Sequence, residues 1–74
     1  MANALALAAR ACEQAGKLSE ASKRYLRAGR SAAQQGDNGD ALSWLNRAEK
    51  LAEEAGDEST AKQARSYRKW LESP

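Results

Sequence analysis

The stretch GKLSEASKRYLRA at residues 16–28 recurs as GDNGDALSWLNRA at residues 36–48, and this repeat decides the fold of the chain. Each copy begins with Gly, has Ala five residues later, a large apolar residue four further on, and a second Ala three beyond that. Spacings of four and three residues keep side chains on one face of an α-helix. The pattern therefore predicts a helix after each glycine, with its apolar face turned towards neighbouring helices.

The same period of 20 residues runs through the whole chain. Its members are the glycines at 16, 36 and 56, the alanines at 21, 41 and 61, and, one period earlier, Leu5, Ala8 and Cys12. Glycine adopts the left-handed conformation that ends a helix at little cost. We therefore predict four helices, over residues 2–15, 19–35, 39–55 and 58–72. Turns of about three residues make each helix antiparallel to the one before it.

Short polar residues follow each turn glycine and are predicted to cap the next helix. They are Ser19-Glu20, Asp37-Asn38 with Asp40, and Asp57-Glu58-Ser59. Their side-chain oxygens can accept hydrogen bonds from the free N–H groups of a first helical turn.

The composition supports an all-α fold. Ala and Leu together supply 25 of the apolar residues, whereas Val, Ile and Phe are absent. Strands draw on β-branched and aromatic residues, so a β-sheet domain is excluded, and Ala and Leu are strong helix formers. Alanine at the contact positions lets helix axes approach closely. Gly29, inside the second helix, is either such a point of close approach or a neutral surface residue.

Several kinds of site are excluded by the residues that are missing. His is absent and Cys12 is the only cysteine, which excludes a disulfide framework, a Cys/His zinc site and a His-based catalytic triad. The turn 36–39 lacks the spacing of a phosphate-binding or calcium loop. We therefore expect no enzyme activity, no cofactor and no metal. No apolar run approaches the roughly 20 residues of a membrane span, so we expect a cytoplasmic protein by default.

Charge alternates along the chain. It is +4 over residues 1–36, −5 over 37–58 and +3 over 59–74, which add to the net +2. This order is poor for nucleic-acid binding, which favours one continuous basic field. Basic residues nevertheless cluster in the second helix (Lys23, Arg24, Arg27 and Arg30) and in the fourth (Lys62, Arg65, Arg68 and Lys69), where two aromatic residues lie among them. Nucleic-acid binding through these two helices is therefore kept as the less favoured alternative.

The unit resembles the tetratricopeptide repeat, a helix–turn–helix unit that stacks into a right-handed α-solenoid. Gly16, Ala21, Tyr25 and Ala28 match the turn glycine, small residue, aromatic residue and alanine of that family, and the copy at 36–48 has Leu for the aromatic. The resemblance implies one module over residues 1–74, made of two stacked hairpins, 2–35 and 39–72. The helices are longer than those of the family, and the second helix also fits the first-helix pattern, which leaves the register open.

The resemblance also implies a function, because members of the family mostly bind proteins or peptides on a concave face lined by the first helix of each pair. Carried over, that face presents Asn3, Ala6, Arg10 and Glu13 from the first helix, and Ser43, Asn46, Lys50 and Glu53 from the third. Of these, Asn3, Arg10, Asn46 and Lys50 are the candidate partner-binding residues. The alternative is that they are ordinary solvated helix positions.

An apolar cluster of Tyr67, Trp70 and Leu71 ends the fourth helix, with no following helix to cover it. Either Trp70 and Leu71 fold back onto the third helix, or the cluster forms the contact of a homo-oligomer or a longer array. Open ends of a short repeat array favour such association. Self-assembly is therefore the alternative to binding a peptide or another protein.

Overall fold

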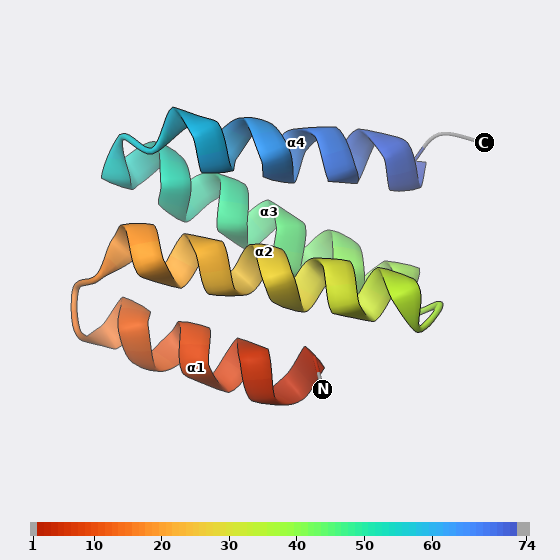
Figure 1. Cartoon of the computed structure of the whole chain (residues 1–74), viewed down its shortest axis with the longest axis horizontal. Helices are drawn as coiled ribbons and strands as arrows, with labels where there is room; N and C mark the ends of the chain where they lie inside the picture. The colour runs from red at the N-terminus through yellow and green to blue at the C-terminus, as the bar shows by residue number, and fades with distance from the viewer. Residues whose placement is uncertain (1, 73–74) are drawn as a thin grey trace.

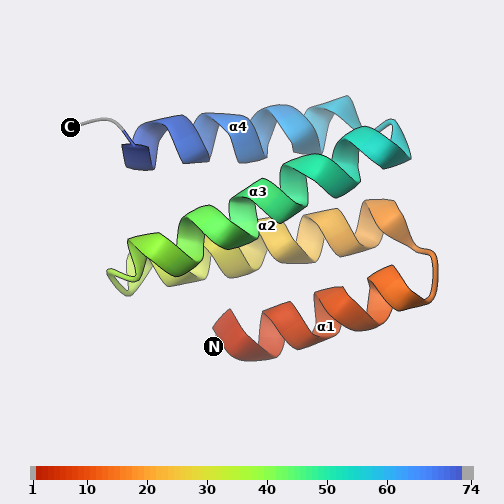
Figure 2. The same ribbon diagram turned by 180° about the vertical axis from the view of Figure 1, so that it is seen from behind.

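The computed structural model describes the backbone of residues 2–72 and the side chains from Ala4 onwards. It contains four helices: α1 (Ala2–Gln14), α2 (Leu18–Gln34), α3 (Asn38–Ala55) and α4 (Glu58–Glu72). The predicted all-α fold is confirmed, and each helix begins and ends within one residue of its predicted bounds. Figures 1 and 2 show α2 and α3 in the middle of the molecule, flanked by α1 next to α2 and α4 next to α3.

The three turns between helices share one hydrogen-bonding pattern. Gly16, Gly36 and Gly56 have φ angles of 80°, 85° and 73°, in the left-handed region. In the first turn the N–H of Gly16 bonds to the carbonyl of Glu13, and the N–H of Lys17 bonds to that of Cys12. The equivalent pairs recur 20 and 40 residues later. This is the Schellman ending, so the glycine period of the sequence is a period of helix ends.

The predicted side-chain caps are present only at α4. Asp57 accepts a hydrogen bond from the backbone N–H of Thr60 at 3.2 Å and another from its hydroxyl at 2.8 Å. At α2 the prediction of a Ser19 cap was wrong, because the helix begins earlier and Ser19 already lies within its first turn. The N-cap position is taken by Lys17, whose backbone carbonyl accepts a hydrogen bond from the N–H of Ala21. Asp37 occupies the same position before α3 but makes no side-chain cap.

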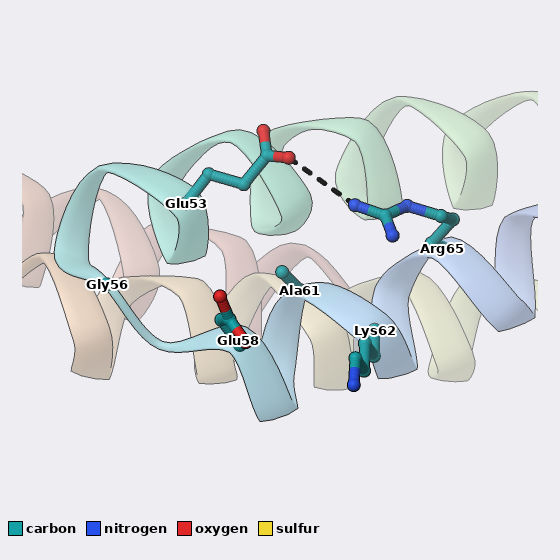
Figure 3. Close-up of a pocket in the computed structure, with 6 residues that line it drawn as sticks. All are labelled: Glu53, Gly56, Glu58, Ala61, Lys62 and Arg65. Atoms are coloured by element: carbon teal, nitrogen blue, oxygen red, sulfur yellow. Dashed lines mark hydrogen bonds and ion pairs between the residues drawn. The ribbon is translucent and has the colours of Figure 1, made fainter.

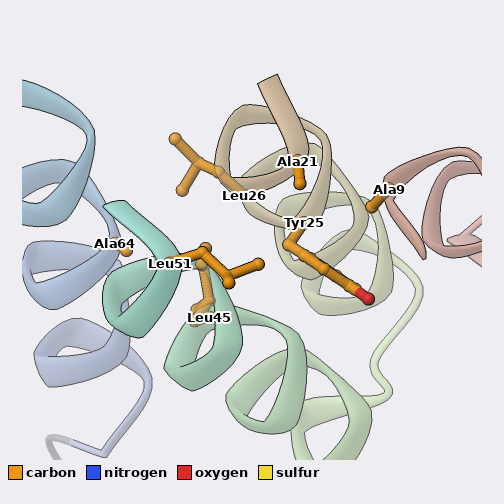
Figure 4. Packing of buried hydrophobic residues seen from close by; sticks show 8 residues of the cluster. Ala9, Ala21, Tyr25, Leu26, Leu45, Leu51 and Ala64 are labelled. Atoms are coloured by element: carbon orange, nitrogen blue, oxygen red, sulfur yellow. The ribbon is translucent and has the colours of Figure 1, made fainter. Parts of the chain in front are cut away.

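The core runs along the contact between α2 and α3, the two most extensively packed helices. Figure 4 shows Leu45 and Leu51 of α3 at its centre, with Ala64 of α4 on one side and Tyr25 of α2 on the other. The repeat alanines lie in helix contacts and are buried: Ala21, Ala28, Ala32, Ala41, Ala48, Ala52 and Ala61. Gly29 is also buried, and an added Cβ there would lie 2.7 Å from Cγ of Leu45, so the close-approach interpretation is confirmed.

The contact face of α1 differs from the predicted one. Ala6 and Ala9 are its buried residues, whereas Leu5, Ala8 and Cys12 are only half-buried. The predicted stripe therefore lies at the edge of the contact instead of its centre. The reason is that α1 packs mainly on one neighbour, α2, while the inner helices have contacts on two sides.

The molecule is a slab of 35 × 24 × 13 Å. Because the slab is thin, both of its broad faces are open to solvent. None of the helices described between residues 2 and 72 is long and apolar enough to cross a membrane.

Candidate functional site

One broad face of the slab is formed by α1 and α3, and an apolar cleft lies between them. The cleft has a volume of about 350 Å³ and is lined by Ala6, Leu7, Arg10 and Trp44. Leu7 is 65% exposed. The cleft thus offers an apolar surface with a guanidinium beside it.

A group of side chains behind this cleft holds α1 and α3 together through α2. The ring of Tyr25 stacks on Trp44 at a centroid distance of 5.7 Å and an angle of 19°. The Tyr25 hydroxyl donates a hydrogen bond to Glu13 at 3.1 Å, and Arg47 pairs with the same carboxylate at 3.1 Å. The hydrogen bond with Glu13 is the main cause that raises the pKa of Arg47 above its ordinary value. These contacts fix the orientation of Trp44 at the cleft.

A second, smaller and more polar cleft continues along the same face. Its volume is about 180 Å³, and it is lined by Glu13, Arg47, Lys50, Leu51 and Glu54. Arg47 is already paired with Glu13, whereas no ion pair to Lys50 occurs within the described residues. The ammonium group of Lys50 is therefore the free cation of this cleft.

The predicted partner-binding residues are partly brought together. Arg10 and Lys50 line the two neighbouring clefts. Asn46 is exposed, but its carbonyl oxygen accepts a hydrogen bond of 2.7 Å from Arg68 of α4, so it belongs to the contact between α3 and α4. The side chain of Asn3 lies outside the described residues.

Two further residues of the predicted concave face have other roles. Ala6 is only 8% exposed and packs in the helix contact, and it also lines the apolar cleft of this face. Glu53 is exposed but pairs with Arg65 at 3.4 Å.

Leu7, Trp44 and Arg47 belong to this face but were not among the predicted binding residues. Leu7 and Trp44 are large apolar residues just outside the regular apolar stripe, and that position is the signal in the sequence that marks them. Arg47 carries no such signal, because its partner Glu13 is 34 residues away.

The aromatic cluster at the end of α4 is divided by the structure. Tyr67 and Leu71 are partly buried and pack against the core, so the fold-back interpretation is confirmed for Leu71 and wrong for Trp70. Trp70 is 70% exposed. The guanidinium of Arg30 lies 5.1 Å from the centroid of the Tyr67 ring. Only Trp70 therefore remains as an open apolar contact.

The joint between α3 and α4 is held by ion pairs. Glu49 pairs with Arg65 Nε at 3.0 Å and with Arg68 Nη1 at 2.8 Å, and the second contact has poor hydrogen-bond geometry. These arginines occupy the positions where the fourth helix departs from the apolar repeat. Charge pairing thus replaces apolar packing along this edge.

A cleft of about 310 Å³ lies beside the turn from α3 to α4, and its lining is mainly charged. Figure 3 shows Arg65 reaching across it to Glu53 and Lys62 pointing away from that pair. Because its charged groups are paired or directed to solvent, the cleft belongs to the helix joint.

No group of three His, Cys, Asp or Glu side chains suitable for a metal ion occurs in the described part of the chain. Separate comparisons with protein families, with curated proteins and with solved structures find no match to this chain.

Proposed function

We propose that this chain is a tetratricopeptide-like module without catalytic activity that binds a peptide or a partner protein on the face between α1 and α3. The observation that carries the proposal is the apolar cleft of Leu7 and Trp44, with cations from both helices beside it. An apolar anchor in a pocket with polar groups around it is the usual form of a peptide contact.

The packing of alternate helices supports the register of two hairpins. The clefts and the Glu13–Arg47 pair join α1 to α3, and α2 contacts α4. This is the arrangement that stacked hairpins require, with first helices on one face and second helices on the other. In that register the face of α1 and α3 is the concave one.

The chemistry of the face indicates the kind of segment that it would bind. An apolar side chain would fill the cleft at Leu7 and Trp44, and a carboxylate would pair with Arg10 or Lys50. Glu54 lines the cleft of Lys50 and limits how many acidic groups can be accepted there. A short segment with one apolar anchor and one or two acidic residues is therefore the proposed partner.

Selection from a display library of short random peptides tests the proposal. We expect enriched peptides to carry an apolar residue near an acidic one. Reversing the charge at Arg10 or Lys50 should weaken their binding about tenfold, or about 1.4 kcal/mol. Arg27→Glu, an equal change in an exposed residue of α2, is the matched control and should have little effect. Peptides that bind equally well to the Leu7→Ala and Lys50→Glu variants would contradict the proposal.

Self-assembly is the second candidate, because Trp70 is a large and openly exposed apolar side chain. Sedimentation at several concentrations tests it. A concentration-dependent increase in mass that Trp70→Ala abolishes would support self-assembly, and a monomer at every concentration would remove it.

A further inference from the structure

The second broad face of the slab, formed by α2 and α4, is basic. The two helices are in direct contact: Ser19 donates a hydrogen bond to Asp57 at 3.0 Å, and Arg30 lies over the ring of Tyr67. The two helices, far apart in the sequence, therefore lie side by side, and the exposed cations of α2 adjoin the aromatic residues of α4.

The acidic residues of α3 do not neutralise this surface. Glu49 and Glu53 are directed to the opposite side of α4, where they pair with Arg65 and Arg68. Glu54 lines the cleft on the α1–α3 face. The order of basic, acidic and basic segments along the chain disfavours nucleic-acid binding. In the folded structure, however, these acidic residues of α3 lie away from the α2–α4 face.

The carboxylates of these two helices are confined to their ends, at Glu20, Glu58 and Glu72. No Asp or Glu occurs at residues 21–36 or 59–71. Glu20 and Asp57 lie at one end of the surface, and Asp57 faces Lys23. The basic part is therefore the exposed run of Lys23, Arg27 and Arg30 on α2.

We define the α2–α4 surface as Lys23, Arg27, Arg30, Tyr67 and Trp70. The three cations are spaced four and three residues apart, so they share the outer side of α2, and all three are exposed. They span seven residues, about 10 Å along the helix. Trp70 lies one turn beyond Tyr67, and the two aromatic residues line an apolar cleft of about 280 Å³.

We propose that the α2–α4 surface binds single-stranded nucleic acid. The three cations would contact successive phosphates, and the exposed Trp70 ring would stack on an unpaired base. Cations beside open aromatic rings are the combination by which proteins hold single strands, because every base has a flat face and every nucleotide a charge. An acidic peptide would pair with the cations only, and the exposed indole ring would have no partner.

A fluorescein-labelled oligothymidine of about ten nucleotides is a suitable probe, read by anisotropy. Three phosphate contacts predict a slope of log affinity against log salt of about −2, or about a 20-fold loss between 50 and 200 mM salt. Arg27→Gln should reduce the magnitude of that slope by about 0.7. Arg10→Gln, on the opposite face, removes the same charge and should leave the slope unchanged.

Trp70→Ala tests the stacking contact separately. We expect it to weaken binding about tenfold or more with the salt slope preserved, since no charge is removed. In a Trp44→Phe background the fluorescence of Trp70 should be quenched by the oligonucleotide. Because Trp70 is largely exposed, its replacement should leave the circular dichroism spectrum unchanged.

Four results would overturn the proposal. The first is no binding at about 50 mM salt, where electrostatic contacts are strong. The second is an equal loss of affinity in Arg27→Gln and Arg10→Gln, which indicates only general attraction by charge. The third is full affinity in Trp70→Ala. The fourth is competition by polyglutamate as effective as that by the unlabelled oligonucleotide, which would identify an acidic protein segment as the occupant.

Discussion

Replacing Gly29 with Ala tests the closest helix contact of the structure. Glycine inside a helix is about 1 kcal/mol less favourable than alanine, so in an open position this substitution stabilises a protein. At Gly29, however, the new Cβ would lie 2.7 and 2.8 Å from two carbons of Leu45 and 3.2 Å from the carbonyl oxygen of Ala41. Two carbon atoms in contact are normally about 3.5 Å or more apart.

The sign of the effect depends on whether Leu45 can move. Its side chain is fully buried between α2 and α3, and the carbonyl of Ala41 is part of the helix backbone. Forcing an extra methyl group into a packed core costs about 1–3 kcal/mol. With two carbons of Leu45 too close, we place the cost at about 3 kcal/mol, near the upper end of that range. Subtracting the gain of about 1 kcal/mol in helix propensity leaves a net destabilisation of about 2 kcal/mol.

Gly39 supplies the matched control. It lies in the first turn of α3, and a Cβ added there would have no neighbouring atom within 4 Å. Gly39→Ala should therefore raise the free energy of unfolding by up to about 1 kcal/mol. Urea unfolding followed by circular dichroism measures both variants. If Gly29→Ala unfolds the chain too far to measure, it can be introduced into the Gly39→Ala background.

A double-mutant cycle with Leu45 separates the contact from general effects. Leu45→Ala alone should cost about 2–5 kcal/mol because it leaves a cavity. Combined with Gly29→Ala, part of that cavity is filled and the clash is removed, so the double variant should be more stable than the sum of the single effects. A Gly29→Ala variant that is as stable as Gly39→Ala, with no coupling to Leu45, would refute the close packing of α2 on α3.

Three other predictions concern single contacts. Glu49→Gln should lower the free energy of unfolding by about 1–2 kcal/mol, between the values for exposed and buried ion pairs, which urea unfolding would detect. Tyr25→Phe removes a hydrogen bond to Glu13 and should cost about 1 kcal/mol, with the loss of amide protection concentrated in α1. The pKa of Asp57 is lowered mainly by the hydrogen bond from the Thr60 hydroxyl, and further by those from the Thr60 N–H and Ser19. The stability that the Asp57 carboxylate contributes is therefore present above about pH 4 and lost as the pH falls further. Melting temperatures of wild type and Asp57→Asn should therefore converge below about pH 4.

The helix boundaries could be predicted because they depend on local chemistry. A glycine in the left-handed conformation ends each of the first three helices, and the next helix begins within two residues of it. The burial of Tyr25 and Leu45 followed from the same local pattern, since α2 and α3 each have helices on two sides. Where the environment of a helix repeats, the periodicity of its side chains predicts its contacts.

The position of α1 could not be predicted in the same way. Its repeat partners Leu5 and Cys12 occupy the positions of buried residues in the inner helices, but α1 has one main neighbour. A helix at the end of a stack can rotate to suit that neighbour, and here the rotation buries Ala6 and Ala9. Periodicity identified the apolar side of this helix to within one residue.

Ion pairs between helices could likewise not be predicted from the spacing of residues in the sequence. Glu13 and Lys17 have the separation of a pair within one helix, yet the turn begins between them and Glu13 pairs with Arg47 of α3. At Arg65 and Arg68 the sequence indicated only a loss of the apolar pattern. Their carboxylate partners became evident once the antiparallel packing of α3 and α4 placed them side by side.

The proposed binding face lies where α1 and α3 are joined by few contacts. An inner helix of a stacked array packs on both sides, but α1 has its main contact with α2 and is joined to α3 chiefly through Glu13. Leu7 is consequently exposed beside Trp44. A partner lying across both helices would add contacts to α1 and to α3 along this face. Its binding would stabilise the folded chain by about 2.7 kcal/mol at a concentration of about 100 times Kd. Because the alanine core is small, we expect occupation of this face to make a large relative difference to the stability of the fold.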